Sequence, residues 1–543
     1  MIHWFNRFST SLLMRIVAMV LILPVGYCAA PEETTAIEAI RKMFADGLYE
    51  AVDRQSAEFA SQFQNSEHLP EIWLIQARAK IRVGRVDDAI LILTQNRDRA
   101  GQRLEEFDFW HAMALGAKGD WNAAADAFGR FLASHTNSVL RIQAAYHQAY
   151  SKYRAGDTAG AVALLNAPDG PIRTRSETNK GDVWIQRSLL LLADMQLASG
   201  KNTEAASTLA ELPEGLTAPE LAWYRSYLTA RIHALSNRWA EALANLTNIW
   251  TTVTNNLSPE ILAGAALLEG EAFERTGQLQ RARSSYERAL ARTTPADQRR
   301  AAMQRIVALG SAPEAVSDTI NWLESFVSSH AGDELLDIAT FSIGQLRLNQ
   351  YLALVRAGAS TIPGTNLPVT NLLHQARARF DMVITNYPSS AFLGEAYFGR
   401  GCCLWEEGTN RLSDMLLSFK SAVEKTSSPA VREIAIFKLA DTQVLMGDFA
   451  TARSNYWYVA TNRVGLASGT NDIAAQALFQ VVRTSIDMND MAAASAALQR
   501  LIDTSPGSPL AERAVLMLGY AYLRLGNAEA ARSSFQSFVN TFT

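Results

Sequence analysis

One spacing of small and large apolar residues recurs along most of the chain. A glycine or asparagine is followed five positions later by alanine and nine positions later by a large apolar side chain. The nine copies are Gly84, Ala89 and Leu93; Gly119, Ala124 and Phe128; Gly156, Ala161 and Leu165; Gly200, Ala205 and Leu209; Asn237, Ala242 and Leu246; Gly277, Ala282 and Tyr286; Gly447, Ala452 and Tyr456; Asn489, Ala494 and Leu498; and Gly526, Ala531 and Phe535. Apolar residues four positions apart lie on one face of an α-helix, so the pattern predicts helices rather than strands.

The residue types at these three positions predict paired helices. Glycine and asparagine can adopt the left-handed conformation that ends a helix, so they mark the turn between two helices. Alanine lets two helices cross closely, and the larger residue fills the adjoining groove. We therefore predict an all-α fold, an α-solenoid in which antiparallel helical hairpins stack on their neighbours.

Two polar, turn-rich stretches interrupt this repeat. Residues 167–182 are predicted to form a solvent-exposed loop between hairpins. Residues 357–370 are rich in glycine, threonine and proline, and they follow a long helical run from about residue 333 to 355. Because long loops of this sort are either functional or boundaries, we predict two arrays in tandem, residues 31–332 and 372–543. Residues 333–371 would form the boundary between them.

The hairpins resemble the tetratricopeptide repeat, whose signature reads W-x2-L-G-x2-Y, then A-x3-F, then P. The two best-matched copies consist of Gly270, Phe273, Gly277, Ala282, Tyr286 and Ala289, and of Leu518, Gly519, Tyr522, Gly526, Ala531 and Phe535. Turn markers between residues 84 and 277 are 35, 37, 44, 37 and 40 positions apart. The family's period is about 34 residues, so longer helices and short loops must absorb the difference.

The N-terminus indicates export. Arg7 and Arg15 precede an apolar run over residues 16–27, and small residues follow it before Pro31. This order is typical of a secretory signal peptide, which we predict over residues 1–30. A lipid anchor on Cys28 and an uncleaved N-terminal membrane anchor are the alternatives.

A second resemblance agrees with export. Residues 380–401 and 498–522 are similar to repeats of bacterial envelope proteins of the outer-membrane assembly lipoprotein and Tol–Pal coordinator types. This similarity implies a location in the cell envelope, and we expect the periplasm.

Composition narrows the function further. The chain has 48% hydrophobic and 19% charged residues, which is typical of a folded protein. Its net charge of −4 comes with no large basic block, which argues against nucleic-acid binding. The histidines do not have metal-ligand spacing, and GxSxG, P-loop and HExxH motifs are missing from the sequence. We predict no catalytic residue, no metal and no cofactor, and we expect Cys402 and Cys403 to be packing residues.

A group of tyrosines and arginines is the strongest candidate for a binding surface. The residues are Tyr146, Tyr150, Tyr153, Arg154, Tyr227 and Arg231. The first four follow one helix face, and the family resemblance implies that first helices line a groove in which the last two take equivalent places. Tyrosine and arginine are enriched at binding hot spots. The alternative is that the tyrosines only pack between hairpins.

These observations predict a non-catalytic scaffold of the bacterial envelope that binds partner proteins or peptides in a helical groove. One alternative is a module for peptidoglycan or another envelope glycan, and another is the non-catalytic part of a longer protein. The last predicted helix carries apolar Phe535, Phe538, Val539 and Phe542 up to Thr543. Because solenoids usually end with a polar cap, we expect either a covering partner or a truncated C-terminal array. The sequence leaves the oligomeric state open.

Overall fold

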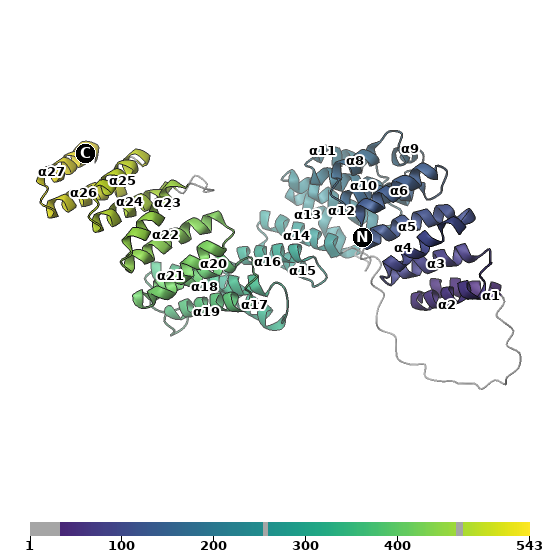
Figure 1. Cartoon of the computed structure of the whole chain (residues 1–543), viewed down its shortest axis with the longest axis horizontal. Coiled ribbons are helices and arrows are strands. Elements are labelled where there is room, and N and C mark those ends of the chain that lie inside the picture. The colour runs from purple at the N-terminus through teal and green to yellow at the C-terminus, as the bar shows by residue number, and fades with distance from the viewer. Residues whose placement is uncertain (1–32, 253–258, 463–470, 506, 543) are drawn as a thin grey trace, which may run out of the picture. The chain divides into compact units, whose positions relative to one another are not determined.

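The computed structural model describes residues 33–252, 259–462, 471–505 and 507–542. Within those ranges the chain forms 27 α-helices and three short 3-10 helices, with no strand beyond one isolated bridge between Thr361 and Pro368. The all-α prediction is confirmed (Figure 1). The predicted signal peptide lies outside the described residues. No helix in the described ranges combines the length and the apolar run that crossing a bilayer requires.

The chain divides into two compact units, Met1–Pro295 and Ala296–Thr543. The helices of unit 1 are α1 (Glu33–Ala45), α2 (Tyr49–Gln62), α3 (Leu69–Arg82), α4 (Val86–Gln95), η2 (Arg97–Arg99), η3 (Gly101–Arg103), α5 (Leu104–Lys118), α6 (Trp121–Ser134), α7 (Arg141–Arg154), α8 (Thr158–Asn166), α9 (Pro171–Thr178), α10 (Val183–Ala198), α11 (Asn202–Ala210), α12 (Pro219–Leu235), α13 (Trp239–Thr252), α14 (Pro259–Arg275) and α15 (Leu279–Arg288). The helices of unit 2 are α16 (Ala296–Leu309), α17 (Val316–Ser329), α18 (Leu336–Arg356), α19 (Thr370–Asn386), α20 (Leu393–Glu407), η4 (Thr409–Arg411), α21 (Leu412–Lys425), α22 (Pro429–Leu445), α23 (Phe449–Thr461), α24 (Asn471–Asp487), α25 (Met491–Thr504), α26 (Pro509–Arg524) and α27 (Ala528–Phe542).

Each repeat marker ends the first helix of a hairpin. All nine markers have a left-handed backbone, with φ from +56° at Asn237 to +91° at Gly156. The alanine five residues later is at most 1% exposed in every copy, as a close helix crossing requires. Consecutive helices pack against each other throughout unit 1 and from α17 onward in unit 2, so the hairpin solenoid is also confirmed.

The hairpin of α22 and α23 shows this packing in unit 2. Gly447 follows α22 with φ of +81°, and Ala452 of α23 is 0% exposed. Tyr456, one turn after Ala452, is 1% exposed and donates a hydrogen bond to Oδ1 of Asp441 at 2.6 Å. Ala452 and Tyr456 belong to a core that also contains Phe437 of α22. Ala452 and Tyr456 are therefore buried structural positions of the repeat, and neither is accessible to a partner.

An aspartate directly after the marker often begins the second helix. The Asp120 carboxylate accepts a hydrogen bond from the Ala123 amide at 3.2 Å, and Asp157 accepts one from Gly160 at 2.8 Å. Asp448 and Asp490 do the same at their own helices. Such caps satisfy amides that have no partner inside the helix. A left-handed residue followed by aspartate therefore ends one helix and starts the next.

Two further glycines make room for aromatic rings. A Cβ atom at Gly270 would lie 2.3 Å from Cε1 of Tyr286, and one at Gly519 would lie 2.7 Å from Cε1 of Phe535. In both hairpins the glycine is on the first helix and the ring is on the second. Glycine is needed there because no side chain fits between helix and ring.

The stretch 167–182 is not the loop that we predicted. Helix α9 occupies residues 171–178 and packs against α7, α8 and α10. Pro171 begins the helix, and Ile172 is buried in the core shared with Ile185 and Leu189. The prediction was wrong because the segment, although mostly polar, buries Ile172 in this core and so packs as a helix.

Residues 333–371 lie within unit 2, whereas the division between the units falls at 295/296. Helix α18 packs directly against α19 across the loop, and Tyr351 and Phe380 belong to the same core. The loop itself is ordered by hydrogen bonds from the Ile362 amide to the Leu367 carbonyl and from Val369 to Ser360. This core joins the long helix of the segment that we predicted as a boundary to the first helices of the predicted C-terminal array.

Candidate functional site

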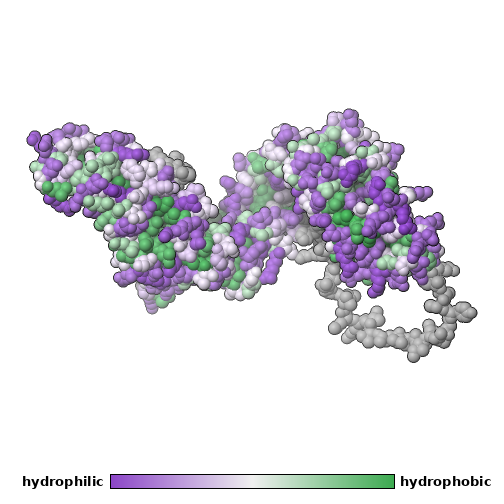
Figure 2. Space-filling model, viewed as in Figure 1, coloured by the Kyte–Doolittle hydropathy of each residue, from purple (hydrophilic) through white to green (hydrophobic). Residues whose placement is uncertain are grey.

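An apolar pocket of about 240 Å³ lies in unit 1 and is lined by residues of α3, α4, α5, α6 and α7. Its lining residues are Ile81, Arg82, Gly84, Val86, Trp110, Met113, Gly116, Ala117, Trp121, Phe128, Tyr146, His147, Tyr150 and Ser151. We call it the aromatic pocket. In the view of Figure 2, apolar residues gather in patches between polar stretches of the surface of both units.

Helix geometry places the walls of the aromatic pocket. Trp110, Met113 and Gly116 follow one another at three-residue intervals on α5, so they share a face. Trp121 is the first residue of α6, and the turn before it brings its ring against Tyr150 of α7. The two ring centroids are 6.0 Å apart with the rings nearly perpendicular. This edge-to-face arrangement is a favourable one for aromatic pairs.

Tyr146, Tyr150 and Arg154 all belong to this site, at different depths. Tyr146 is 1% exposed and stacks on Tyr150 at 6.2 Å, while Trp184 covers it from α10. Tyr150 is half-buried, and its hydroxyl accepts a hydrogen bond from Nη1 of Arg154 at 3.0 Å. The Arg154 guanidinium is exposed and lies 4.8 Å from the centroid of Trp121. Tyr146 therefore forms the floor, whereas Tyr150 and Arg154 form the rim.

The other three predicted residues gather around Asp194 of α10. Tyr224 donates a hydrogen bond to Oδ2 of Asp194 at 2.7 Å, and Arg231 forms an ion pair with Oδ1. Arg231 also lies 5.7 Å from the ring centroid of Tyr227. Burial and the nearby Asp194 carboxylate raise the pKa of Tyr153. This cluster joins α7, α10 and α12, and its charges are paired internally.

The charge around the aromatic pocket is positive. Among its described lining residues none carries a carboxylate, and Arg82 is the one with a permanent charge. His147 is neutral at physiological pH because burial lowers its pKa to about 3. Arg78, one helical turn before Arg82, has its guanidinium 4.8 Å from the rings of both Phe44 and Trp110.

Several residues of the site that we did not predict stand at fixed distances from the turn markers in the sequence. Arg82 and Arg154 both stand two residues before a turn marker, and Trp121 stands two residues after one. Arg78 and Met113 stand six residues before their markers, in the same place as Tyr150. Trp110 has no such regularity. The periodic part of the site could be found from the sequence once the register was known.

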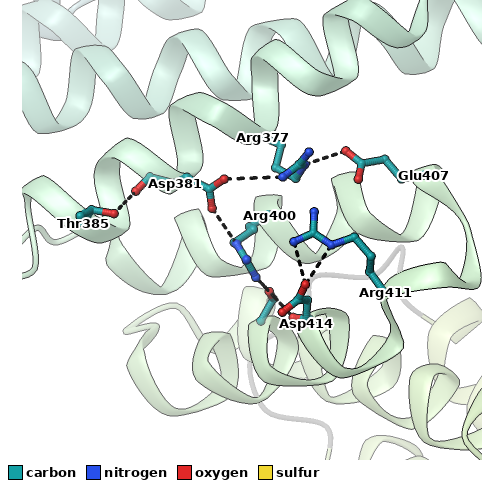
Figure 3. Close-up of polar contacts among 8 residues, drawn as sticks. Arg377, Asp381, Thr385, Arg400, Glu407, Arg411 and Asp414 are labelled. Carbon is teal, nitrogen blue, oxygen red and sulfur yellow. Dashed lines mark hydrogen bonds and ion pairs between the residues drawn. The ribbon is translucent and has the colours of Figure 1, made fainter.

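Arginines and carboxylates of unit 2 form a network of polar contacts (Figure 3). Arg377 pairs with Glu407 at 2.7 Å, and Arg400 bridges Asp381 at 2.7 Å and the Ser418 hydroxyl at 2.6 Å. Every carboxylate drawn in this network contacts an arginine, so the network fastens α19, α20 and α21 together.

Cys402 and Cys403 lie beside this network on α20. Burial raises the pKa of the Cys402 thiol to about 12 and raises that of Cys403 as well. Both thiols are therefore protonated at neutral pH, which makes them poor nucleophiles. Within the described ranges, no three His, Cys, Asp or Glu side chains are grouped so that they could hold a metal ion.

Comparison with known proteins identifies the repeat. The family model for the tetratricopeptide repeat matches residues 111–171 and 482–540, one segment in each unit. These two segments carry tetratricopeptide repeats. Proteins built from this repeat are typically non-catalytic scaffolds, and the first matched segment contains most of the aromatic pocket. No curated relative matches the sequence.

Solved structures show likeness at low sequence identity. A tetratricopeptide repeat protein from Parabacteroides merdae is 12% identical, with 50% of this chain and 98% of that chain covered at a TM-score of 0.38. The Cut9-Hcn1 hetero-tetramer of the APC/C is 13% identical, with 94% of both chains covered at 0.36. A structure of Naa15/Naa10 bound to HypK-THB is 14% identical, with 94% and 76% covered at 0.27. These TM-scores carry no information on partners or activity.

Proposed function

We propose that this tetratricopeptide repeat protein is a non-catalytic scaffold that binds a segment of a partner protein in unit 1, at the aromatic pocket. The pocket is the observation that carries the proposal. Its volume of about 240 Å³ is below the roughly 300 Å³ at which small-molecule sites begin. A single apolar side chain of a partner suits it better than a whole cofactor.

The residue types around the pocket support protein binding. Trp, Tyr and Arg dominate binding hot spots because they supply large contact areas with few rotatable bonds or with several donors. Trp121, Tyr150 and Arg154 meet at the rim and hold one another in place. A surface organised in this way before binding loses little side-chain entropy when a partner arrives.

Filling the pocket tests this function. Met113→Trp adds a ring inside the cavity, while Ala206→Trp adds the same ring at an exposed position on α11. Both variants of the full chain, immobilised beside the wild type, would be exposed to an extract of the source cell, and retained proteins would be quantified by mass spectrometry. We expect Met113→Trp to lose partners that wild type and Ala206→Trp retain. Equal retention by all three would overturn the proposal.

Glycan binding is the second candidate, since aromatic rings at a groove can stack on sugars. The Trp121 ring is the best placed for this, but the Arg154 guanidinium lies over it at 4.8 Å. This coverage favours a protein ligand over a sugar. A sedimentation assay with purified peptidoglycan separates the two, because Trp121-dependent sedimentation with the polymer would favour the glycan.

We propose further that the protein is exported, with the periplasm of a bacterial cell as its site of action. Arg7, Arg15 and the apolar run over residues 16–27 support this location. Cell fractionation and mass spectrometry of the mature N-terminus test it. A mature chain beginning near residue 31 is expected, a lipid-modified Cys28 would indicate the anchored form, and retention of Met1 in a cytoplasmic fraction would contradict export.

A further inference from the structure

The hairpin of α26 and α27 in unit 2 carries an open groove of about 380 Å³. Figure 1 shows the two helices side by side, and the groove is lined by Leu523 of α26 and by Ala528 and Phe535 of α27. Leu523 is 48% exposed, and Tyr520, one turn before it, is 62% exposed. Large apolar side chains exposed together beside a groove are typical of a surface that binds another molecule.

The same repeat positions are buried in the preceding hairpins of unit 2. Three residues before the turn marker, Ile486 is 5% exposed, against 48% for Leu523. Twelve residues after the marker, Val459 and Leu501 are 0% exposed, whereas Phe538 is half-buried. The cover is the first helix of the following hairpin, because α23 packs against α24 and α25 packs against α26. Among the described helices, α27 packs closely against α26 alone.

Arg532 indicates the charge of a covering segment. Its side chain is exposed at the groove, six residues after Gly526, and has no hydrogen bond or ion pair with another described residue. Arg453 stands six residues after Gly447, and its Nη1 lies 2.7 Å from Oδ2 of Asp490. Asp490 directly follows the turn marker of the next hairpin. A helix that covers α27 in the same register therefore brings a carboxylate from its following turn to Arg532.

We propose that the groove of α26 and α27 binds an amphipathic helix of a partner protein, followed by a turn whose aspartate or glutamate pairs with Arg532. This helix takes the place on α27 that α24 takes on α23 within the chain. Its apolar residues follow the pattern of Leu478, Val482 and Ile486, which recur every four positions on α24 and lie in the core shared with α23. The site lies in unit 2 and is additional to the aromatic pocket of unit 1.

A second copy of the chain offers a poorer match for the groove. The first described helix, α1, exposes polar Thr34, Glu38 and Lys42, which do not complement an apolar lining. The later first helices of unit 1 and those of unit 2 from α18 onward already pack between neighbouring helices of their own unit. A helix from a different protein is therefore the better occupant.

A synthetic peptide of residues 471–490 tests the site, because it contains α24 and the turn with Asp490. The equivalent surface of α23 is already occupied by the chain's own α24. Binding of the fluorescein-labelled peptide to the full chain would be measured by fluorescence anisotropy. We expect saturable binding, at least about tenfold weaker when Leu478, Val482 and Ile486 of the peptide are all serine. Asp490→Asn in the peptide should weaken binding about three- to fivefold.

Protein variants locate the binding. Ala528→Trp fills the groove and should weaken the peptide at least about tenfold. Ala353→Trp adds the same ring at an exposed position of α18 and should change nothing. Arg532→Asp should weaken the peptide about five- to tenfold, and a peptide with Asp490→Arg should restore the affinity to within about twofold of the original pair. Arg356→Asp, at an exposed arginine of α18, is the matched control for charge.

The outcomes separate this site from its alternatives, once circular dichroism shows that each variant remains helical. A peptide that does not bind, or that binds wild type and Ala528→Trp equally, overturns the proposal. Dimerisation of the full chain in sedimentation velocity, abolished by Ala528→Trp, would assign the groove to a second copy and also overturn it. Neither result bears on the aromatic pocket, which Met113→Trp tests separately.

Discussion

The guanidinium of Arg154 lies 4.8 Å from the centroid of the Trp121 ring and joins two successive hairpins. Trp121 stands two positions after the turn of one hairpin, and Arg154 stands two positions before the turn of the next. The same pairing recurs between Trp239 and Arg275, at 5.7 Å. A cation over an aromatic ring is thus a repeated link between neighbouring hairpins of unit 1.

This link has a measurable coupling energy. In a double-mutant cycle of Trp121→Ala and Arg154→Ala, we expect a coupling of about 0.5–1 kcal/mol in the free energy of unfolding, as for an exposed cation–π pair. Chemical denaturation of the full chain, followed by circular dichroism, gives the four values. Arg238→Ala in place of Arg154→Ala is the control and should give no coupling to Trp121. Strict additivity for the Trp121–Arg154 pair would show that the contact contributes nothing.

Gly270 is a sharper test of packing within a hairpin. Its missing side chain leaves room for the Tyr286 ring, which is 1% exposed and held by a hydrogen bond to Glu274 at 2.9 Å. Gly270→Ala should destabilise unit 1 by about 1–3 kcal/mol, because the ring must shift in a filled core. Gly215→Ala, where a Cβ meets no atom within 4 Å, should leave the free energy of unfolding unchanged or slightly raised. Equal thermal unfolding of both variants would contradict this account.

The turns and helix crossings could be predicted from the sequence because they depend on local chemistry. A left-handed Gly119, a capping Asp120 and a small Ala124 have the same consequences in any surrounding structure. These residues set the hairpins and their register. The number of residues between successive turn markers varies along the chain, but the spacing of marker, alanine and large apolar residue within a hairpin does not.

The depth of the candidate site residues could not be predicted in the same way. Tyr146 and Tyr150 share a helix face, yet only Tyr146 is fully buried, because Trp184 of a later helix covers it. Trp121 meets Tyr150 only because two hairpins stack with a particular offset. Helix α9 likewise exists because Ile172 finds a neighbouring core. These contacts are set by stacking between hairpins, which the repeat pattern alone does not define.

His147 should make the stability of unit 1 depend on pH. Its Nε2 atom is buried without a hydrogen-bond partner among the described residues, its ring stacks on Phe128 at 5.6 Å, and burial lowers its pKa to about 3. In the unfolded chain the pKa of histidine is about 6.5, so between these values the unfolded state binds the extra proton. Stability is therefore retained above pH 6.5 and falls by up to about 1.4 kcal/mol for each pH unit below it.

The variant His147→Phe keeps an aromatic ring at this position and removes the titration. Denaturation at pH 7.5, 6.5 and 5.5 should show the wild type losing stability relative to the variant across the last interval. Comparison with the variant cancels the titration of all other groups. A difference between the two proteins that stays constant over this range would mean that the pKa of His147 is the same in the folded and the unfolded chain.

A buried ion pair should dominate the stability of the start of unit 2. Arg299 and Asp333 have side chains 4% and 2% exposed, with Nη2 and Oδ2 2.6 Å apart. Oδ1 of Asp333 also accepts a hydrogen bond from the Leu335 amide at 2.9 Å. Asp333→Asn keeps that acceptor but removes the buried charge that faces Arg299, while Glu334, which is half exposed and 2.8 Å from Nη1 of Arg299, remains. We expect a loss of about 3 kcal/mol, the low end for breaking a buried pair, because Glu334 remains.

Removing both charges distinguishes the pair from simple packing. The double variant Arg299→Met, Asp333→Asn has no buried arginine that needs a counter-charge. It should therefore recover at least half of the stability that Asp333→Asn loses. Glu314→Gln, at an exposed carboxylate of the same unit, should stay within about 0.5 kcal/mol of wild type. Chemical denaturation of the four proteins gives the comparison. If the double variant is less stable than Asp333→Asn alone, the aliphatic packing of Arg299, and not its charge, stabilises this end of unit 2.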